Sequence, residues 1–247
     1  FLILKLFHKK IKGYVLLRSD GFKEYHIKFG LIGRFFYNIA FYQITKKLNI
    51  ITVSKELSNL YHSNFKVVTP SELTTRWFKK SKVKVDKKKA KLLYVGRFKK
   101  EKGIFSLLNL IKEKSKINLT IVGASEEDKI IYQSNVNTLK IVQDKKELIN
   151  LYDKNNITIL PSYTEGYPMI ILESLSRLRP IIVFREIEHV VENRKGIFVT
   201  TRDYSSLSET IKHIINNYDS IQESMKLNKL PDNDTFINQL KEILSKN

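Results

Sequence analysis

The amino-acid sequence predicts an α/β protein built on parallel β-sheets, and three observations carry that prediction. Short apolar runs rich in β-branched residues recur along most of the chain, as is typical of parallel strands that are buried on both faces. Segments of helical length separate many of these runs and place apolar residues three and four positions apart on one face. The composition is that of a globular protein, because 42% of the 247 residues are hydrophobic and 28% are charged.

The individual elements follow from these patterns in chain order. The predicted strands are residues 13–17, 50–53, 65–68, 91–95, 117–122, 139–142, 157–160, 180–184 and 196–199. The predicted helices are residues 103–116, 145–155, 207–217 and 235–244, together with an apolar helix that has Pro168 in its first turn. This alternation of strand and helix indicates βαβ units, whose strands are parallel.

The lysine-rich residues 81–90 lack a sustained apolar face and are predicted to form a basic linker. They separate an N-terminal domain, residues 1–80, from a C-terminal domain, residues 91–230. A complete doubly wound domain has about six strands, and only three are predicted before the linker, so the N-terminal domain is expected to be incomplete. The chain begins with Phe rather than Met, which supports the same expectation. Residues 231–247 are predicted to form a helix that packs back on the N-terminal domain.

The net charge of +19 is distributed unevenly along the chain. Residues 1–100 contain 24 Lys and Arg against 5 Asp and Glu, whereas residues 101–247 contain 20 of each kind. This asymmetry favours a surface for a membrane or a nucleic acid in the first part, and a codon bias towards lysine is the alternative interpretation. The absence of cysteine excludes disulfides and thiolate zinc sites. No uninterrupted apolar stretch reaches the roughly 20 residues of a membrane span.

The first motif follows the predicted strand 91–95. It reads Val95-Gly-Arg-Phe-Lys-Lys-Glu-Lys-Gly103 and places Arg97 and Lys102 in one loop. Ligands of open α/β sheets bind at the carboxyl ends of the strands. Arginine grips phosphate oxygens with two donors there, and lysine supplies a point charge. The motif is therefore a candidate phosphate site, but taken alone it favours the other interpretation, a solvated loop in a lysine-rich protein.

The second motif, LPSYTEGYPMIILES at residues 160–174, links the predicted strand 157–160 to the apolar helix. Pro168 suits the first turn of that helix, whose N–H groups and dipole favour an anion. Glu173 lies about one and a half turns further on, among apolar neighbours. A carboxylate there needs a partner, which the hydroxyls of a sugar would supply, and an ordinary exposed helix position is the alternative.

Together the two motifs resemble the donor domain of the GT-B glycosyltransferases, in particular the retaining group classed as family 4. That family shows GR-x4-KG after one strand and PS-x2-EG-[FY]-P-x4-E after a later one. This chain has Gly96-Arg97 with Lys102-Gly103, then Pro161-Ser162 with Glu165-Gly166-Tyr167-Pro168 and Glu173. The resemblance covers roughly residues 91–217. It implies two Rossmann-like domains with parallel sheets, the N-terminal one incomplete, and a hexosyltransferase-like enzyme that uses a nucleotide sugar.

The resemblance also implies roles for individual residues. Arg97 and Lys102 would hold the donor diphosphate, Glu173 would bind the nucleotide ribose, and Glu165 would lie beside the transferred sugar as a catalytic residue. The substrate-binding residues that it implies are Gly96, Arg97, Lys102, Gly166, Tyr167, Pro168, Met169 and Glu173. Fixed cations and N–H groups at the leaving diphosphate would stabilise the charge that develops there.

In this family the N-terminal domain binds the acceptor, and the match is weaker in that part of the chain. The family's glycine-rich loop has no counterpart here. The predicted strand 13–17 leads into Arg18-Ser-Asp-Gly21, at a point where relatives often carry a histidine near the reaction centre. Asp20 would supply a second catalytic carboxylate, and an Asp-Gly turn is the alternative interpretation.

The implied partners are a nucleotide-sugar donor and a glycan or lipid-linked acceptor, as in polysaccharide biosynthesis for a capsule or lipopolysaccharide. No cofactor and no metal are implied, because Arg97 and Lys102 take the place of a metal ion. The Asp-x-Asp of the chain, Asp232-Asn-Asp234, is predicted to cap the following helix instead. The expected location is cytoplasmic, peripheral on the inner face of the plasma membrane. A catalytically inactive remnant that binds nucleotide is the alternative function.

Residues 27–48 combine aromatic and branched apolar residues with Lys28, Arg34, Lys46 and Lys47. One interpretation is an interfacial helix, with its apolar face at the lipid headgroups and its cations on anionic lipid. Another is a core helix of the N-terminal domain whose cover lies outside this sequence. Nucleic-acid binding is a third interpretation, but no recognised RNA-binding motif supports it and no nucleic-acid partner is predicted.

Overall fold

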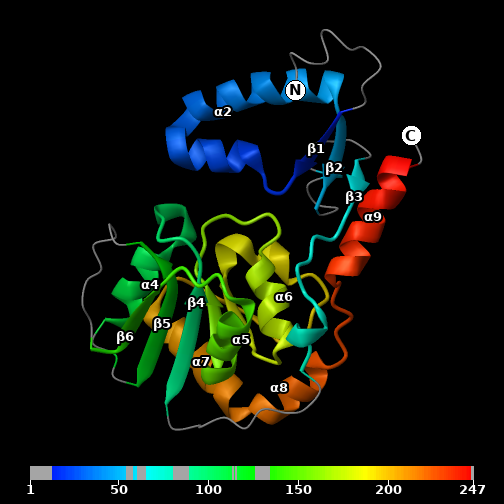
Figure 1. The fold of residues 1–247 in the computed structure, drawn as a ribbon. Coiled ribbons are helices and arrows are strands. Elements are labelled where there is room, and N and C mark those ends of the chain that lie inside the picture. Colours follow the sequence, from blue (N-terminus) through cyan, green and yellow to red (C-terminus); the bar gives the residue numbers. More distant parts are fainter. Residues whose placement is uncertain are drawn as a thin grey trace. The chain divides into compact units, whose positions relative to one another are not determined.

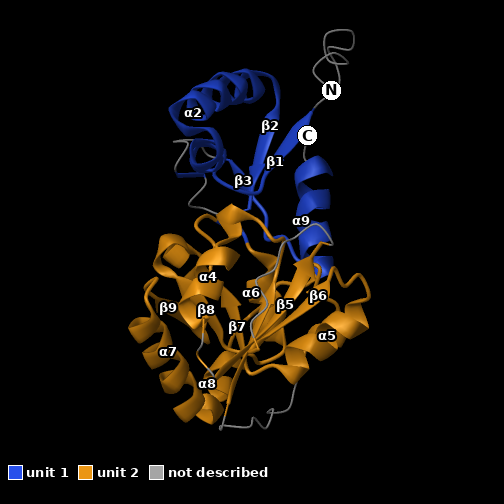
Figure 2. Ribbon diagram, turned by 90° about the vertical axis from the view of Figure 1, so that its left-hand side faces the viewer, with its two compact units in different colours: residues 1–71, 165–167, 233–247 blue, residues 72–164, 168–232 orange. Residues whose placement is uncertain are grey.

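The computed structural model describes residues 13–53, 58–59, 65–79, 89–112, 114, 116–125 and 134–245. The chain divides into two compact units (Figure 2). Unit 1 comprises Phe1–Ser71, Glu165–Tyr167 and Asn233–Asn247, and unit 2 comprises Glu72–Thr164 and Pro168–Asp232. Unit 1 contains a three-stranded sheet and unit 2 a six-stranded sheet, and both are parallel. The predicted α/β class with parallel sheets is therefore confirmed.

The six strands of unit 2 lie in the order β6-β5-β4-β7-β8-β9 (Figure 1). They are β4 (Ala90–Val95), β5 (Ile117–Ala124), β6 (Val136–Lys140), β7 (Ile157–Leu160), β8 (Ile181–Phe184) and β9 (Ile197–Thr200). The chain builds outwards from β4 to β6, returns to the other side of β4, and builds outwards again to β9. The two directions diverge between β4 and β7, and ligands of such sheets bind at the carboxyl ends of the strands beside that switch point.

Burial explains which strands the sequence predicts accurately. Every residue of β7 and β8 is buried, so both appear as uninterrupted runs. Strand β6 lies at the edge of the sheet and is only half-buried. The predicted strand 139–142 is wrong by about three residues, since Val136 pairs with Leu119 and Leu139 with Val122, while Ile141 is 66% exposed. At an edge, hydrogen bonding to the neighbouring strand decides the register rather than apolar content.

Helices cover both faces of the unit 2 sheet, with α5 and α7 on opposite sides (Figure 2). They are α4 (Ile104–Ile111), α5 (Lys145–Lys154), α6 (Met169–Ser176), α7 (Tyr204–Asn216) and α8 (Tyr218–Met225), with the 3-10 turns η1 (Thr75–Trp77), η2 (Lys100–Lys102) and η3 (Arg185–Val191). Helix α4 ends before the predicted residue 116, because the Ile117 N–H bonds the Lys114 carbonyl in the turn that starts β5. Helix α8 was not predicted.

Unit 1 consists of the parallel strands β1 (Tyr14–Leu17), β2 (Asn49–Thr52) and β3 (Lys66–Val67), together with helices α2 (Gly21–Lys47) and α9 (Asn233–Ser245). Within this unit, Gln239 of α9 contacts the segment after β3. Its side-chain oxygen accepts hydrogen bonds from the backbone N–H and the hydroxyl of Thr69 at 2.8 and 3.0 Å. The last helix is thus joined to the chain that follows the three-stranded sheet.

Helix α2 reverses direction at Gly30 (Figure 1). Gly30 has φ 65°, which glycine adopts without strain. The ring of Phe22 lies 4.8 Å from that of Tyr37 and 5.7 Å from that of Phe41, so the two arms pack through aromatic side chains. A helix is present over the predicted residues 27–48, but it begins at Gly21 and is broken by this reversal, which the apolar pattern does not reveal.

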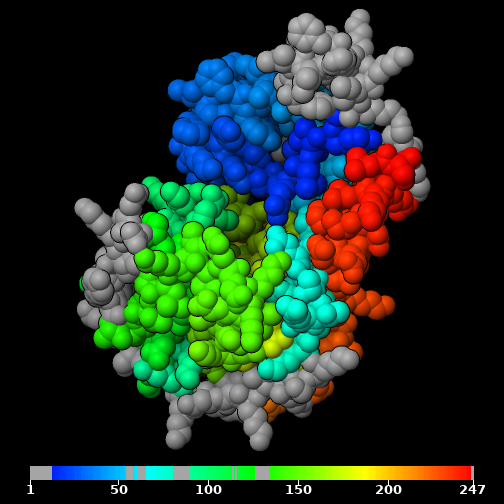
Figure 3. Space-filling view, viewed as in Figure 1, coloured from blue at the N-terminus to red at the C-terminus, as the bar shows by residue number. Residues whose placement is uncertain are grey.

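Most large apolar side chains of α2 are exposed, and the helix forms a broad surface in the blue part of the space-filling view (Figure 3). The side chains between 41% and 73% exposed are Tyr25, Ile27, Phe29, Leu31, Ile32, Phe35, Phe36, Ile39 and Tyr42. The basic residues Lys28, Arg34, Lys46 and Lys47 are exposed on the same helix. Among the described helices, none has the length and apolar content that crossing a membrane requires.

Candidate functional site

The loop after β4 carries the first motif and is fixed at both ends. The Tyr94 hydroxyl donates a hydrogen bond to the Arg97 carbonyl at 2.8 Å. At the other end, Gly103 has φ 67°, and a Cβ on this residue would stand 1.9 Å from the Pro161 carbonyl oxygen. Glycine is therefore required here by its conformation and by the close approach of the loop that follows β7.

The two motif loops are joined directly. The Tyr163 N–H, in the loop after β7, donates to the Glu101 carbonyl in the loop after β4 at 3.0 Å. Gly96 follows β4 immediately, Arg97 is exposed, and Lys102 is half-buried. Because β4 and β7 are neighbours, both motifs lie at the carboxyl edge of the sheet beside the switch point.

Helix α6 begins inside the second motif, at Met169. Pro168 is its N-cap, with φ −76°, rather than a residue of its first turn as predicted, and Met169 is the first helical residue. Proline has no side-chain acceptor for the N–H groups of the first turn. Those N–H groups and the positive end of the helix dipole therefore suit an anion.

Glu173 lies in α6 and accepts a hydrogen bond from a tyrosine of α5. The distance between Tyr152 Oη and Glu173 Oε2 is 2.7 Å, and Tyr152 is 0% exposed. Burial raises the pKa of the Glu173 carboxyl; the Tyr152 bond and the positive charge of Lys145 oppose the rise, and the negative charge of Glu72 adds to it. Burial and the charge of Glu173 also raise the pKa of Tyr152 well above its ordinary value. Glu173 is thus half-buried and partnered, not an ordinary exposed position.

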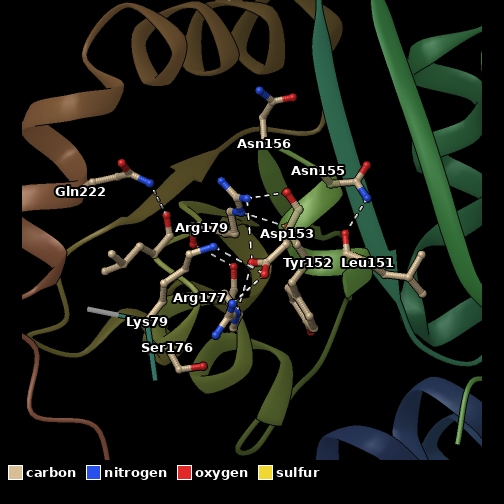
Figure 4. Close-up of polar contacts among 12 residues, drawn as sticks. Lys79, Leu151, Tyr152, Asp153, Asn155, Asn156, Ser176, Arg177, Arg179 and Gln222 are labelled. Carbon is tan, nitrogen blue, oxygen red and sulfur yellow. Dashed lines mark hydrogen bonds and ion pairs between the residues drawn. The ribbon is translucent and has the colours of Figure 1, made fainter. Parts of the chain in front are cut away.

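A charged cluster fixes the backbone beside Tyr152 (Figure 4). The Asp153 carboxylate accepts two hydrogen bonds from Arg177, at 2.6 and 3.2 Å, and lies 3.5 Å from the Lys79 ammonium. The Arg179 side chain is 2% exposed, and its Nε donates to the Tyr152 carbonyl at 2.9 Å. Because Arg177 and Arg179 follow α6 directly, the cluster joins the ends of α5 and α6.

Arg202 ties together the loops that follow β7, β8 and β9. Its Nε donates to Glu186 at 2.8 Å, and its Nη2 donates to the Pro161 carbonyl at 3.0 Å. The guanidinium carbon lies 4.0 Å from the ring centre of Tyr163 and 4.4 Å from that of Phe184. One planar group therefore stacks on two rings and donates from its edge. This residue was missed because its partners come from separate loops.

The remaining predicted site residues, Asp20, Glu165, Gly166 and Tyr167, belong to unit 1. Asp20 accepts the Lys23 N–H at 3.2 Å and is the N-cap of α2, so the Asp-Gly turn considered from the sequence is a helix start instead. A Cβ at Gly166 would stand 2.0 Å from the Arg18 carbonyl oxygen, which leaves room for glycine alone. The structure thus groups Gly96, Arg97, Lys102, Pro168, Met169 and Glu173 in unit 2 and the other four in unit 1.

Tyr152 is the other contributor that sequence analysis missed. It lies on the apolar face of the predicted helix 145–155, and the sequence pattern gave it no role in the site. A buried tyrosine hydroxyl usually has a hydrogen-bond partner, and that was the available signal. Over the described ranges, no group of three or more His, Cys, Asp or Glu side chains is arranged to hold a metal ion.

Comparisons with known proteins agree with this geometry. Residues 75–229 match the family model described as glycosyl transferases group 1. The capsular polysaccharide biosynthesis glycosyltransferase CapM of Staphylococcus aureus is 28% identical over 148 residues, which are 53% of this chain and 38% of CapM. The chain spans 38%, 42% and 49% of the lengths of three curated relatives that it matches, less than half of each.

Solved structures show the same fold. Sucrose-phosphate synthase from Thermosynechococcus elongatus matches with a TM-score of 0.76 at 16% identity, over 99% of this chain and 70% of that one. HepE of Anabaena, solved in complex with UDP-glucose, matches with a TM-score of 0.74 at 16% identity, over 99% and 75%. The three- and six-stranded parallel sheets thus match part of the GT-B architecture. Because the family model covers well over half of the chain, this protein belongs to the group 1 glycosyltransferases of the GT-B fold.

Proposed function

We propose that this protein transfers a sugar from a nucleotide-sugar donor to a glycan or lipid-linked acceptor. The observation that best supports the proposal is the meeting of two loops at the switch point of unit 2, through the hydrogen bond between Tyr163 and Glu101. Two cations, a helix N-terminus and the Glu173 carboxylate then share one edge of the sheet. A nucleoside diphosphate has the complementary groups, an anionic diphosphate and a ribose with hydroxyls.

The chemistry of the donor side follows from charge. As the glycosidic bond breaks, negative charge builds up on the leaving diphosphate. Arg97, Lys102 and the N–H groups that start α6 are proposed to stabilise it, and Glu173 is proposed to bind the ribose. Losing one fixed donor of this kind commonly costs about 3–4 kcal/mol of activation free energy.

For the sugar and the acceptor, we propose the two carboxylates of unit 1. Positive charge develops on the sugar as the leaving group departs, and a nearby carboxylate stabilises it. Glu165 is proposed for this role, with Gly166 and Tyr167 bringing backbone close to the donor. Asp20 is proposed to act on the acceptor side. Retention of the anomeric configuration follows from the family alone.

Two relatives support the substrate class. HepE was solved with UDP-glucose, and CapM is described as an enzyme of capsular polysaccharide biosynthesis. We therefore propose a uridine diphosphate sugar as the first donor to test, and a growing surface polysaccharide or its lipid-linked precursor as the acceptor.

The test has two stages. Thermal shift and calorimetry with UDP, GDP, ADP and CDP establish whether a nucleoside diphosphate binds. The matching nucleotide sugars are then incubated with lipid-linked and oligosaccharide acceptors, and the products are analysed by mass spectrometry. Glycosylated product supports the transferase. Binding without transfer to any acceptor supports an inactive nucleotide-binding remnant, and absence of binding contradicts both.

For α2, we propose contact with the surface of an anionic membrane. The exposed aromatic and branched side chains of α2 and its four exposed basic residues, Lys28, Arg34, Lys46 and Lys47, support this proposal. Apolar insertion at the headgroup boundary and attraction to anionic lipid would act together. A lipid-linked acceptor would be presented at such a surface.

A further inference from the structure

The hydroxyl of Tyr152 is held in one place by its surroundings. The side chain is 0% exposed, and its ring packs edge-on against the ring of Trp77 at 5.7 Å. Its carbonyl accepts the Nε–H of Arg179 at 2.9 Å, and the next residue, Asp153, lies within the charged cluster of α5 and α6 (Figure 4). Neither the backbone nor the ring can turn away from Glu173 without breaking buried contacts.

The bond between Tyr152 and Glu173 restricts the carboxylate. A carboxylate has two oxygens and about four lone-pair sites, all acceptors when it is ionised. Tyr152 donates to Oε2 at 2.7 Å, which restricts rotation of the group and leaves acceptor sites for ribose hydroxyls. Such bonds to a charged acceptor are stronger than those between neutral groups.

We propose that Tyr152 is a positioning residue of the donor site, whose hydroxyl orients the Glu173 carboxylate so that it accepts the ribose hydroxyls. The proposal rests on the proposed function. Tyr152 touches neither diphosphate nor sugar in this role and acts only through Glu173.

The ionisation of Glu173 provides a signature of this role. Burial raises the pKa of the carboxyl, and the Tyr152 bond and Lys145 lower it, while Glu72, 3.6 Å from Lys145, raises it. Ribose binding needs the ionised acceptor, so affinity rises as the pH passes the raised pKa. Removing the Tyr152 hydroxyl raises that pKa further. The loss of affinity is then greatest at low pH and smaller at high pH.

The decisive comparison is Tyr152→Phe against Tyr218→Phe. Both tyrosines are buried in unit 2, at 0% and 1% exposure, and each substitution removes one hydroxyl. The Tyr218 hydroxyl donates to the Asn156 carbonyl at 2.6 Å and contacts Arg179, not Glu173. Tyr218→Phe therefore controls for the general cost of losing a buried hydroxyl.

Affinity for UDP is measured by calorimetry between pH 5.5 and 8.5. The diphosphate itself titrates in this range, so the ratio of variant to wild-type affinity is compared at each pH. Tyr152→Phe is expected to weaken binding about tenfold near pH 6 and less at pH 8.5. Tyr218→Phe is expected to change neither the affinity nor its pH dependence. The 2′,3′-dideoxy analogue of UDP, which lacks the ribose hydroxyls, should bind both variants equally.

A double variant, and the binding of UDP by the wild type, distinguish failure of the inference about Tyr152 from failure of the proposed function. In a Glu173→Gln background, adding Tyr152→Phe should weaken binding far less than it does in the wild type. If Tyr152→Phe matches Tyr218→Phe at every pH while the wild type binds UDP, the inference about Tyr152 is overturned and the proposed function stands. If the wild type binds no nucleoside diphosphate, both are overturned.

Discussion

Gly103 packs against Pro161 so closely that a Cβ on Gly103 would stand 1.9 Å from the Pro161 carbonyl oxygen. The two residues end one motif and begin the other, and the contact sets the distance between the loops after β4 and β7. Arg202 donates to the same carbonyl at 3.0 Å. The carboxyl edge of the sheet is therefore shaped by a backbone contact that no side chain can replace.

Gly103→Ala should weaken nucleotide binding at least tenfold and destabilise unit 2 by about 1–3 kcal/mol, because the loops must separate and the residue must adopt a strained φ. Gly30→Ala is the matched control. Gly30 has a similar φ of 65°, but no heavy atom lies within 4 Å of the position that a Cβ on Gly30 would take. Calorimetry with UDP and urea unfolding measure both effects. Equal affinities for the two variants would contradict the role of the Gly103–Pro161 contact.

Arg97→Ala should lower the affinity for UDP about tenfold or more, since it removes a cation proposed to bind the diphosphate. Arg194→Ala is the control, because Arg194 is also in unit 2 and pairs with Glu192 at 2.7 Å on a different loop. The affinity of the Arg97 variant should also depend less on salt. If both variants bind UDP as the wild type does, the assignment of Arg97 is wrong.

Glu173→Gln should stabilise the protein at neutral pH while it weakens UDP binding. The pKa of Glu173 is raised by burial, so the native state holds a proton over a pH range in which the unfolded chain has lost it. Stability from this group is present below the ordinary glutamate pKa and is lost as pH rises through the raised value.

Glutamine is neutral at every pH, so the variant does not lose folding stability as the pH rises through the raised pKa of Glu173. The melting temperature of Glu173→Gln should exceed that of the wild type at pH 7.5 and approach it at pH 4, while UDP binding falls. Scanning calorimetry at the two pH values tests the sign. A variant that is less stable than the wild type at pH 7.5 would contradict it.

Arg202→Lys should destabilise unit 2 by about 2 kcal/mol, because an ammonium cannot stack on Tyr163 and Phe184 while donating to both Glu186 and Pro161. Arg185→Lys is the control, at an exposed position of η3. Urea unfolding followed by circular dichroism compares the two. A loss for Arg202→Lys no larger than that for Arg185→Lys would show that the stacked guanidinium adds nothing.

Replacing Phe35 and Phe36 of α2 by serine should reduce binding to vesicles that contain anionic lipid at least tenfold, because both rings are more than 60% exposed and available for insertion. The control replaces Ile141 and Leu227 by serine, two apolar residues with 66% and 77% exposure in unit 2. Co-sedimentation with neutral and anionic vesicles, at low and high salt, measures binding. If the wild-type protein does not bind anionic vesicles, the membrane proposal is contradicted, and codon bias remains as the explanation for the basic residues of α2.

Local sequence predicts the parts of the fold that burial makes uniform. Strands β7 and β8 are buried throughout, so their runs of apolar residues indicate them almost to the residue. Local sequence does not predict the structure where contact with another element, or a single backbone angle, determines it. The edge strand β6 is set by its pairing with β5, and the reversal of α2 depends on φ at Gly30, which the helical pattern does not show.

The candidate site divides in the same way. Arg97, Lys102 and Glu173 stand in recognisable motifs, because the phosphate and ribose sites proposed for them would demand particular residue types at fixed places in a strand–loop–helix unit. Tyr152 and Arg202 stand in neither of the two motifs. Tyr152 meets Glu173 from another helix at 2.7 Å. Arg202 lies after β9 and meets residues at the ends of two other strands, β7 and β8.

The positive charge of the chain illustrates what the sequence determined and what the tertiary structure determined. The sequence by itself determined that the first hundred residues carry the net charge and that two motifs, residues 95–103 and 160–174, resemble those of a glycosyltransferase donor domain. Only the tertiary structure decided that the cations and exposed aromatic residues of α2 lie together on one folded-back helix. It also decided that Glu173 is hydrogen-bonded to Tyr152. Composition and motif spacing are local properties, whereas burial and hydrogen-bond partners exist only after distant segments pack against each other.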